Sequence, residues 1–240
     1  MIWLIPALIV AFVLLVWMTV RAQWSPEKRR KELSAVAEGL GWGFEPQATG
    51  VDVDPAFPLF NSGGRRQVNE RLWGTLDGRP VEVFDYQYTV STGQNRYTAL
   101  QTVIHVEDPA LALPTFSLRP ENAVQRRVSV LPGPWTELLA HPEFSKRYAL
   151  RGPDHAALRI RFNGPLAGVF ESNRGLYAEG GNGHLYIYRN IVAVRQAQFP
   201  GWLEEMTGVL RAFYATAERT TPYPGPLAPP LVPPTLAPPT

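Results

Sequence analysis

Histidines and carboxylates are the side chains that could carry catalytic or metal chemistry in this 240-residue chain. No two of the histidines stand at the HxH, HxxxH or HExxH spacings typical of zinc sites. The chain contains no cysteine, which excludes disulfides, thiolate metal sites and a cysteine nucleophile. We assign no catalytic, cofactor-binding or metal-ligating residue. The histidines, of which the first and last are interpreted as structural, are His105, His141, His155 and His184.

Three loop sequences resemble ligand-binding motifs only in composition. Residues 61–66 (NSGGRR) could bind an anion through backbone N–H groups and two guanidiniums, but they lack the lysine and spacing of a P-loop. Residues 180–183 (GGNG) are explained more directly as a hairpin turn. Asp52 and Asp54 lack the further ligands of a calcium loop. The GxSxG elbow of serine hydrolases is absent.

One alternating segment offers the most unusual polar residues. Phe84, Tyr86 and Tyr88 fall on one face of a predicted strand, and we expect a helix to cover that face. The row could stack RNA bases, but it lacks the basic residues of such a surface. Asp85 and Gln87 fall on the opposite face, where they either face water or line a groove. The candidate groove residues are Asp85, Gln87, His105 and His184.

The elements that must position these residues begin with a helix and a β-meander. Ser25-Pro26-Glu27 is a helix start, and apolar residues at helical spacing continue to Leu40. Residues 43–64 have a loop-like composition. Strands are expected over 68–76, 81–90 and 97–107, joined by turns at Asp77-Gly78 and Gly93. Residues 113–118 are expected to form an edge strand, because their proline suits a sheet margin.

The second half of the sequence predicts a hairpin and a long helix. Residues 123–140 are ambiguous, and 154–162 fit either a helix or an edge strand. Residues 175–188 indicate a hairpin, which 191–194 could extend. Phe199 to Tyr214 carries a broad apolar stripe, typical of a helix that covers a sheet. The predicted fold class is α+β, an antiparallel β-sheet packed by helices.

The first twenty residues contain no charged side chain, and the next eleven contain five basic ones. About 20 apolar residues suffice for a helix to span a bilayer. Nothing basic precedes the run and no small-residue cleavage site follows it, so we interpret it as an uncleaved anchor rather than a signal peptide. The positive-inside rule then places the amino terminus outside and the rest in the bacterial cytoplasm. The residues expected at the membrane interface are Arg21, Trp24, Lys28, Arg29, Arg30 and Lys31.

Composition sets the domain organisation and excludes one class of partner. We predict a transmembrane anchor over 1–24, a soluble domain over 25–220 and a disordered proline-rich tail over 221–240. The soluble part is either one domain or two similar halves split near 122–150. The net charge is +2, and the juxtamembrane cluster accounts for the excess. The balanced remainder argues against nucleic acid as a partner.

Several short motifs resemble a family. They are residues 66–69 (RQVN), 72–74 (LWG), 78–81 (GRPV), 84–88 (FDYQY), 101–103 (QTV) and 113–121 (LPTFSLRPE). Together they resemble an uncharacterised group of bacterial membrane-anchored proteins with a domain of unknown function. The resemblance covers roughly residues 35 to 215. It implies an N-terminal hydrophobic segment and no particular activity.

These observations favour a single-pass inner-membrane protein whose cytoplasmic domain binds a protein partner or a small ligand. The bilayer itself is an expected partner, and no cofactor is expected. Two alternatives remain. One is an enzyme at the membrane surface that uses Asp85, His105 or His184. The other is a peripheral lipid-binding module that uses a groove between the sheet and a helix.

Overall fold

The computed structural model describes residues 25–48, 54–92, 95–121 and 135–220. The expected anchor and tail lie outside these residues. In the described part of the chain, no helix has the length and apolar character needed to cross a membrane. The elements are α2 (Pro26–Leu40), β1 (Gly43–Glu45), η1 (Pro58–Asn61), β2 (Gly64–Leu76), β3 (Arg79–Thr92), β4 (Asn95–Glu107), η2 (Pro109–Leu111), β5 (Phe116–Pro120), α4 (Pro142–Arg147), β6 (Tyr148–Arg151), α5 (His155–Phe162), α6 (Pro165–Ser172), β7 (Leu176–Gly181), β8 (His184–Arg189), η3 (Gln196–Gln198) and α7 (Phe199–Thr220).

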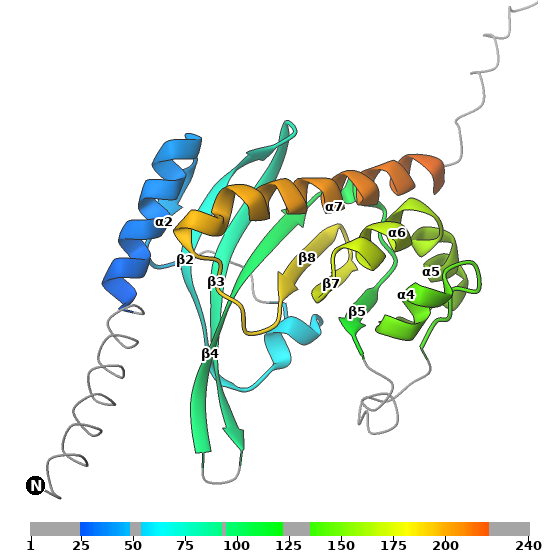
Figure 1. Ribbon diagram of the computed structural model, residues 1–240, viewed down its shortest axis with the longest axis horizontal. Helices are drawn as coiled ribbons and strands as arrows, with labels where there is room; N and C mark the ends of the chain where they lie inside the picture. The colour runs from blue at the N-terminus through cyan, green and yellow to red at the C-terminus, as the bar shows by residue number, and fades with distance from the viewer. Residues whose placement is uncertain (1–24, 49–53, 93–94, 122–134, 221–240) are drawn as a thin grey trace, which may run out of the picture.

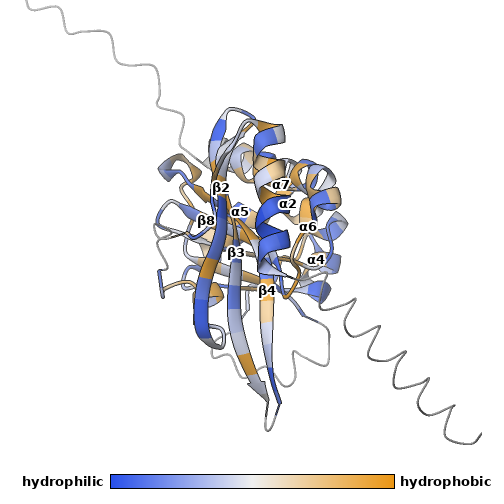
Figure 2. Cartoon of the chain, turned by 90° about the vertical axis from the view of Figure 1, so that its left-hand side faces the viewer, coloured by the Kyte–Doolittle hydropathy of each residue, from blue (hydrophilic) through white to orange (hydrophobic). Residues whose placement is uncertain are grey.

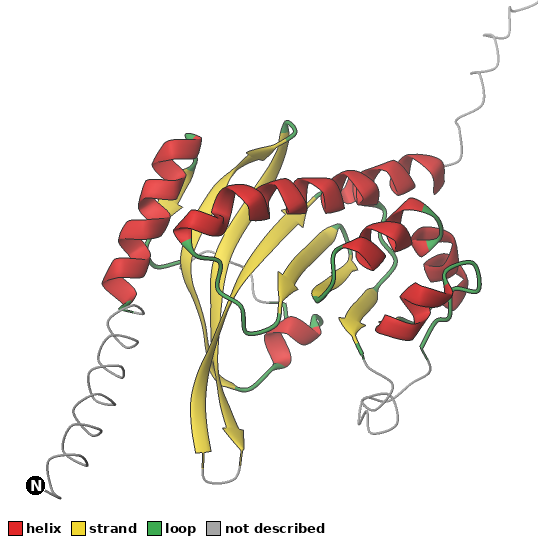
Figure 3. Cartoon of the chain, in the orientation of Figure 1, coloured by secondary structure: helices red, strands yellow, loops and turns green. Residues whose placement is uncertain are grey.

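One antiparallel sheet of eight strands runs through both halves of the sequence, in the order β1-β2-β3-β4-β8-β7-β5-β6. Strand β4 of the first half pairs directly with β8 of the second. Figure 3 shows this sheet in yellow, with α7 crossing it. The predicted α+β class with an antiparallel sheet is confirmed. β5 is not the predicted edge strand, because it pairs with β6 on one side and β7 on the other.

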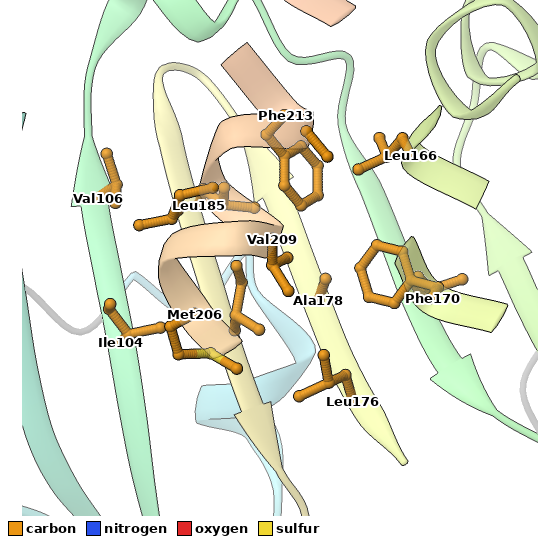
Figure 4. Close-up of a cluster of buried hydrophobic side chains, with 14 of the residues drawn as sticks. Ile104, Val106, Leu166, Phe170, Leu176, Ala178, Leu185, Met206, Val209 and Phe213 are labelled. Carbon is orange, nitrogen blue, oxygen red and sulfur yellow. The ribbon is translucent and has the colours of Figure 1, made fainter. Parts of the chain in front are cut away.

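The face of the sheet that carries α2 and α7, here called the helix face, is aliphatic at its centre. Met206, Val209 and Phe213 of α7 point toward it (Figure 4). They pack on Ile104, Leu185 and their neighbours in the sheet, while α6 adds Leu166 and Phe170 at the side. The apolar stripe of residues 199–214 is therefore confirmed as the core-facing side of a helix.

The opposite face of the sheet, here called the far face, holds the aromatic row. Phe84 and Tyr86 are fully buried there, under Phe57 and Phe60 of the segment that includes η1. The expected cover, a helix such as α7, was therefore wrong. The loop-like interpretation of residues 43–64 was also incomplete, because β1 and η1 form within it. Tyr86 packs edge-to-face on Phe60 with ring centroids 5.3 Å apart, and Phe84 stacks on the same ring at 6.5 Å.

Local sequence explains how α2 begins and how the long strands turn. The Ser25 hydroxyl accepts a hydrogen bond from the Lys28 N–H, and Gly41 ends the helix with φ of 67°. Asp77 and Gly78 both take positive φ between β2 and β3. In Figure 1, α2 stands beside the long strands at one end of the sheet. The paired ends of β3 and β4 extend beyond the rest of the sheet.

Candidate functional site

A buried ion pair fixes α2 to the sheet. Arg29 Nε donates to Asp85 Oδ2 at 2.7 Å, and its Nη2 donates to Asp85 Oδ1 at 3.0 Å. Thr102 Oγ1 donates to the same carboxylate at 2.7 Å, and Arg29 Nη1 donates to the Val194 carbonyl. The Asp85 side chain is 1% exposed and that of Arg29 is 11% exposed. Arg29 therefore points into the sheet rather than toward a lipid surface.

Between α2 and strands β2–β4 lies a polar cavity of about 510 Å³, here called the α2 groove. Three carboxamides from the sheet line it, together with basic and acidic side chains from the helix. Figure 2 shows α2 as a mostly hydrophilic helix beside these strands. The lining residues that bear charges or amides are Lys28, Arg29, Arg30, Glu32, Gln67, Asn69, Glu70, Gln87 and Arg195.

A β-bulge in β2 gives this cavity two of its polar side chains. The pairing register between β2 and β3 shifts between Val68 and Arg71. Asn69 and Glu70, which are adjacent in sequence, therefore both line the groove, although strand alternation would send them to opposite faces. Sequence reasoning missed both residues, because strand alternation carries no signal for a bulge. The predicted Gln87 accepts a hydrogen bond from Asn69 Nδ2 at 3.3 Å.

Glu70 is the most perturbed carboxyl in the groove. Its side chain is 6% exposed, and Arg30 Nε lies 3.3 Å from its Oε1. Burial raises the pKa of Glu70 and the nearby Asp85 charge adds to this, while Arg30 and Arg29 act in the opposite direction. Arg30 Nε makes no hydrogen bond within the described chain, so this pair is loose by comparison with Arg29–Asp85.

The basic residues expected at the membrane interface therefore have different surroundings. Lys28 and Arg30 line the α2 groove and are 53% and 41% exposed. Lys31 is exposed and does not line it. Arg21 and Trp24 lie outside the described residues.

The four residues of the candidate groove do not form one site. Asp85 opposes Thr102 on the helix face, whereas His105 opposes Glu82 and Tyr186 on the far face. His105 Nε2 and His184 Nδ1 lie 3.2 Å apart, so the structure brings the two histidines together. Asp85 and Gln87 lie on the other face of the sheet, because the pairing of β3 with β4 points residues 85 and 105 to opposite sides.

The other sequence motifs have local structural roles. Arg66 donates to the carbonyls of Gly63 and Asn61, which uses its guanidinium within its own loop. Asn182 and Gly183 take positive φ in the β7–β8 turn, as a hairpin requires. In the described residues, no three His, Asp or Glu side chains are grouped so as to hold a metal ion.

The fold and the groove thus define an α+β protein with one antiparallel sheet and a polar cavity under its first described helix. No model of a known protein family matches the chain, and no curated protein matches it. One similar solved structure is the crystal structure of the mycobacterial trehalose monomycolate transport factor A, TtfA. It is 12% identical, with a TM-score of 0.47, over 77% of this chain and 94% of that chain. No role is transferred from a similarity this distant.

Proposed function

We propose that the chain is a membrane-anchored binding protein whose α2 groove takes the polar headgroup of an anionic phospholipid. One observation carries the proposal. The cavity is lined mainly by polar side chains, and several of them belong to the helix that follows the apolar segment in sequence. Pro26, the first residue of α2, lines the cavity itself. The proposal develops the expected small-ligand and lipid-binding alternatives rather than the protein-partner one.

Chain length keeps the groove near the bilayer. Six peptide units separate Val20, the end of the apolar run, from Pro26. An extended chain spans at most about 3.3–3.6 Å per residue, so the groove begins within roughly 20 Å of the hydrocarbon boundary. The headgroup layer adds roughly 5–8 Å beyond the hydrocarbon on each side. A lipid headgroup can therefore enter the groove without leaving the membrane surface.

The lining favours a ligand with both an anionic group and hydroxyl groups. Lys28 and Arg30 are partly exposed, and their acidic partners hold them loosely, at 4.0 Å for Glu32 and 3.3 Å for Glu70. Both cations are therefore available to a phosphate. The carboxamides of Gln67, Asn69 and Gln87 offer donors and acceptors that match glycerol hydroxyls.

The test counts lipids bound to the full chain in a zwitterionic detergent by native mass spectrometry, using phosphatidylglycerol and phosphatidylcholine. We expect preferential binding of phosphatidylglycerol. Lys28→Gln should weaken it roughly five-fold, because a basic residue near an anionic lipid contributes about 1 kcal/mol. A detergent micelle is chosen because a charged bilayer would attract every basic side chain alike.

Lys31→Gln is the matched control. It removes the same charge from the same helix at a position that does not line the groove. Its affinity for phosphatidylglycerol should stay within two-fold of the parent, a margin of roughly 0.4 kcal/mol. Equal losses in both variants would mean non-specific attraction, and equal binding of the two lipids would reject the proposal.

A further inference from the structure

The far face carries a second cavity, of about 430 Å³, at the ends of β2, β3 and β4. We call it the Trp73 cavity. Trp73, Glu82 and His105 line it from three neighbouring strands, and their Cα positions are directly opposed in the sheet. Its volume lies within the roughly 300–1,000 Å³ typical of small-molecule sites. It is independent of the α2 groove because it opens on the other side of the sheet.

Trp73 forms a fixed flat wall of this cavity. A Cβ added to Gly43 would lie 2.1 Å from Cε2, 2.3 Å from Cζ2 and 2.5 Å from Nε1 of the indole. These similar distances place the ring face against the β1 backbone, where only glycine leaves room for it. Trp73 as a whole residue nevertheless remains 43% exposed. An exposed aromatic ring held by backbone is suited to stacking a ligand.

The polar groups of the cavity come as a connected set. Arg71 Nη2 donates a short hydrogen bond to Glu82 Oε1. His105 Nδ1 lies 3.5 Å from Glu82 Oε2, while its Nε2 contacts His184. The His105 side chain is 9% exposed, and its Nδ1 makes no hydrogen bond within the described chain. Nδ1 is itself buried and faces the Glu82 carboxylate, so His105 holds this carboxylate in place rather than contacting a ligand.

Of the charged side chains that line the cavity, Arg71 and Glu82 pair with each other, which restricts the class of ligand. Arg71 neutralises Glu82, and its guanidinium lies 5.4 Å from the Trp73 ring centroid, so the protein itself supplies the cation near this ring. The groups left for a ligand are the exposed part of the Trp73 ring and carboxylate acceptors that include Glu107. A pyranose has an apolar C–H face and a rim of hydroxyl groups, which complements this set.

We propose that the Trp73 cavity binds a neutral sugar ring, stacked on Trp73 with its hydroxyl groups donating hydrogen bonds to Glu82 and Glu107. The proposal concerns binding alone, and no covalent bond is made or broken. Saturation-transfer NMR tests it with the full chain in phosphatidylcholine nanodiscs and methyl glucopyranoside or methyl galactopyranoside as probe. Sugar-headed detergents are left out because they would compete.

We expect transfer to the ring protons of at least one pyranoside and none to sorbitol, which lacks a ring. Trp73→Ala should raise the dissociation constant of the sugar at least ten-fold. Glu107→Gln should raise the same constant several-fold, and Glu107 is exposed, so we expect the variant to fold. Trp135→Ala is the control, because Trp135 is similarly exposed, at 38%, and does not line the cavity.

Three results with the sugar and sorbitol probes would overturn the proposal. They are the absence of transfer to either pyranoside, equal transfer to sorbitol, or transfer that Trp73→Ala and Glu107→Gln leave unchanged. Choline is included as a cationic probe. Binding of choline in place of the sugars would show that the cavity selects positive charge and would equally reject the proposal.

Discussion

Replacing Asp85 by alanine should detach α2 from the sheet. The change removes both hydrogen bonds that Asp85 accepts from Arg29, together with the one from Thr102. The Arg29 guanidinium, whose side chain is 11% exposed, then keeps only carbonyl and hydroxyl partners. Breaking a buried ion pair on one side costs about 3–5 kcal/mol. For a domain of this size, that lowers Tm by roughly 6–20 °C.

The assay combines thermal unfolding of the full chain in detergent with hydrogen exchange. Exchange should accelerate in residues 26–40 well before the α7 core opens, because α2 meets the sheet through this pair, the looser Arg30–Glu70 pair and a few apolar contacts. The double variant Arg29→Met with Asp85→Leu should recover more than half of the lost stability, since no charge stays buried. A loss below about 1 kcal/mol for Asp85→Ala, or no recovery in the double variant, would refute the reasoning.

Three further predictions concern the rest of the fold. Phe213→Ala should destabilise the protein by about 3–5 kcal/mol in thermal unfolding, because this buried ring packs against three other phenylalanines. The control Leu139→Ala, at a 90% exposed position, should change the free energy of unfolding by less than about 0.5 kcal/mol. The His105 imidazole, followed by Arg71, lowers the pKa of Glu82 from 4.5 to about 2. The ionised Glu82 therefore contributes fully to folding stability above pH 4.5, and this contribution is lost as the pH falls toward 2. Glu82→Gln should therefore reduce the stability difference between pH 6 and pH 2 by up to about 3 kcal/mol, and an unchanged acid profile would contradict this. Gly43→Ala should displace the Trp73 indole, visible as a changed indole N–H shift in NMR, and an unmoved resonance would contradict the contact.

Much of the fold was readable from local patterns. The Ser25 cap, the Asp77-Gly78 turn, the hairpin over 175–188 and the stripe of residues 199–214 each depend on neighbours in sequence. Such signals survive folding because tertiary packing reinforces them rather than competing with them. Residues 154–162, which were ambiguous, form helix α5 behind an Asp154 cap.

The rest depended on contacts between distant segments. The aromatic row of β3 has the same alternation whether α7 or η1 covers it, so the sequence does not say which face meets the helix. The place of β5 inside the sheet follows from its pairing with β7, some 60 residues later. The four predicted groove residues lie on two different faces of the sheet for a similar reason. Asp85 and His105 lie on different strands, and only the pairing register decides whether they share a face.

The central claim is that the α2 groove holds a lipid headgroup, and photocrosslinking tests it most directly. The full chain carrying p-benzoylphenylalanine in place of Leu100, which lines the groove, is reconstituted in vesicles containing phosphatidylglycerol. The same residue in place of Tyr97 is the control, since Tyr97 is exposed on the opposite face of the same strand. We predict lipid adducts at position 100 and few at 97. Equal adducts at both positions, or none at 100, would contradict the account.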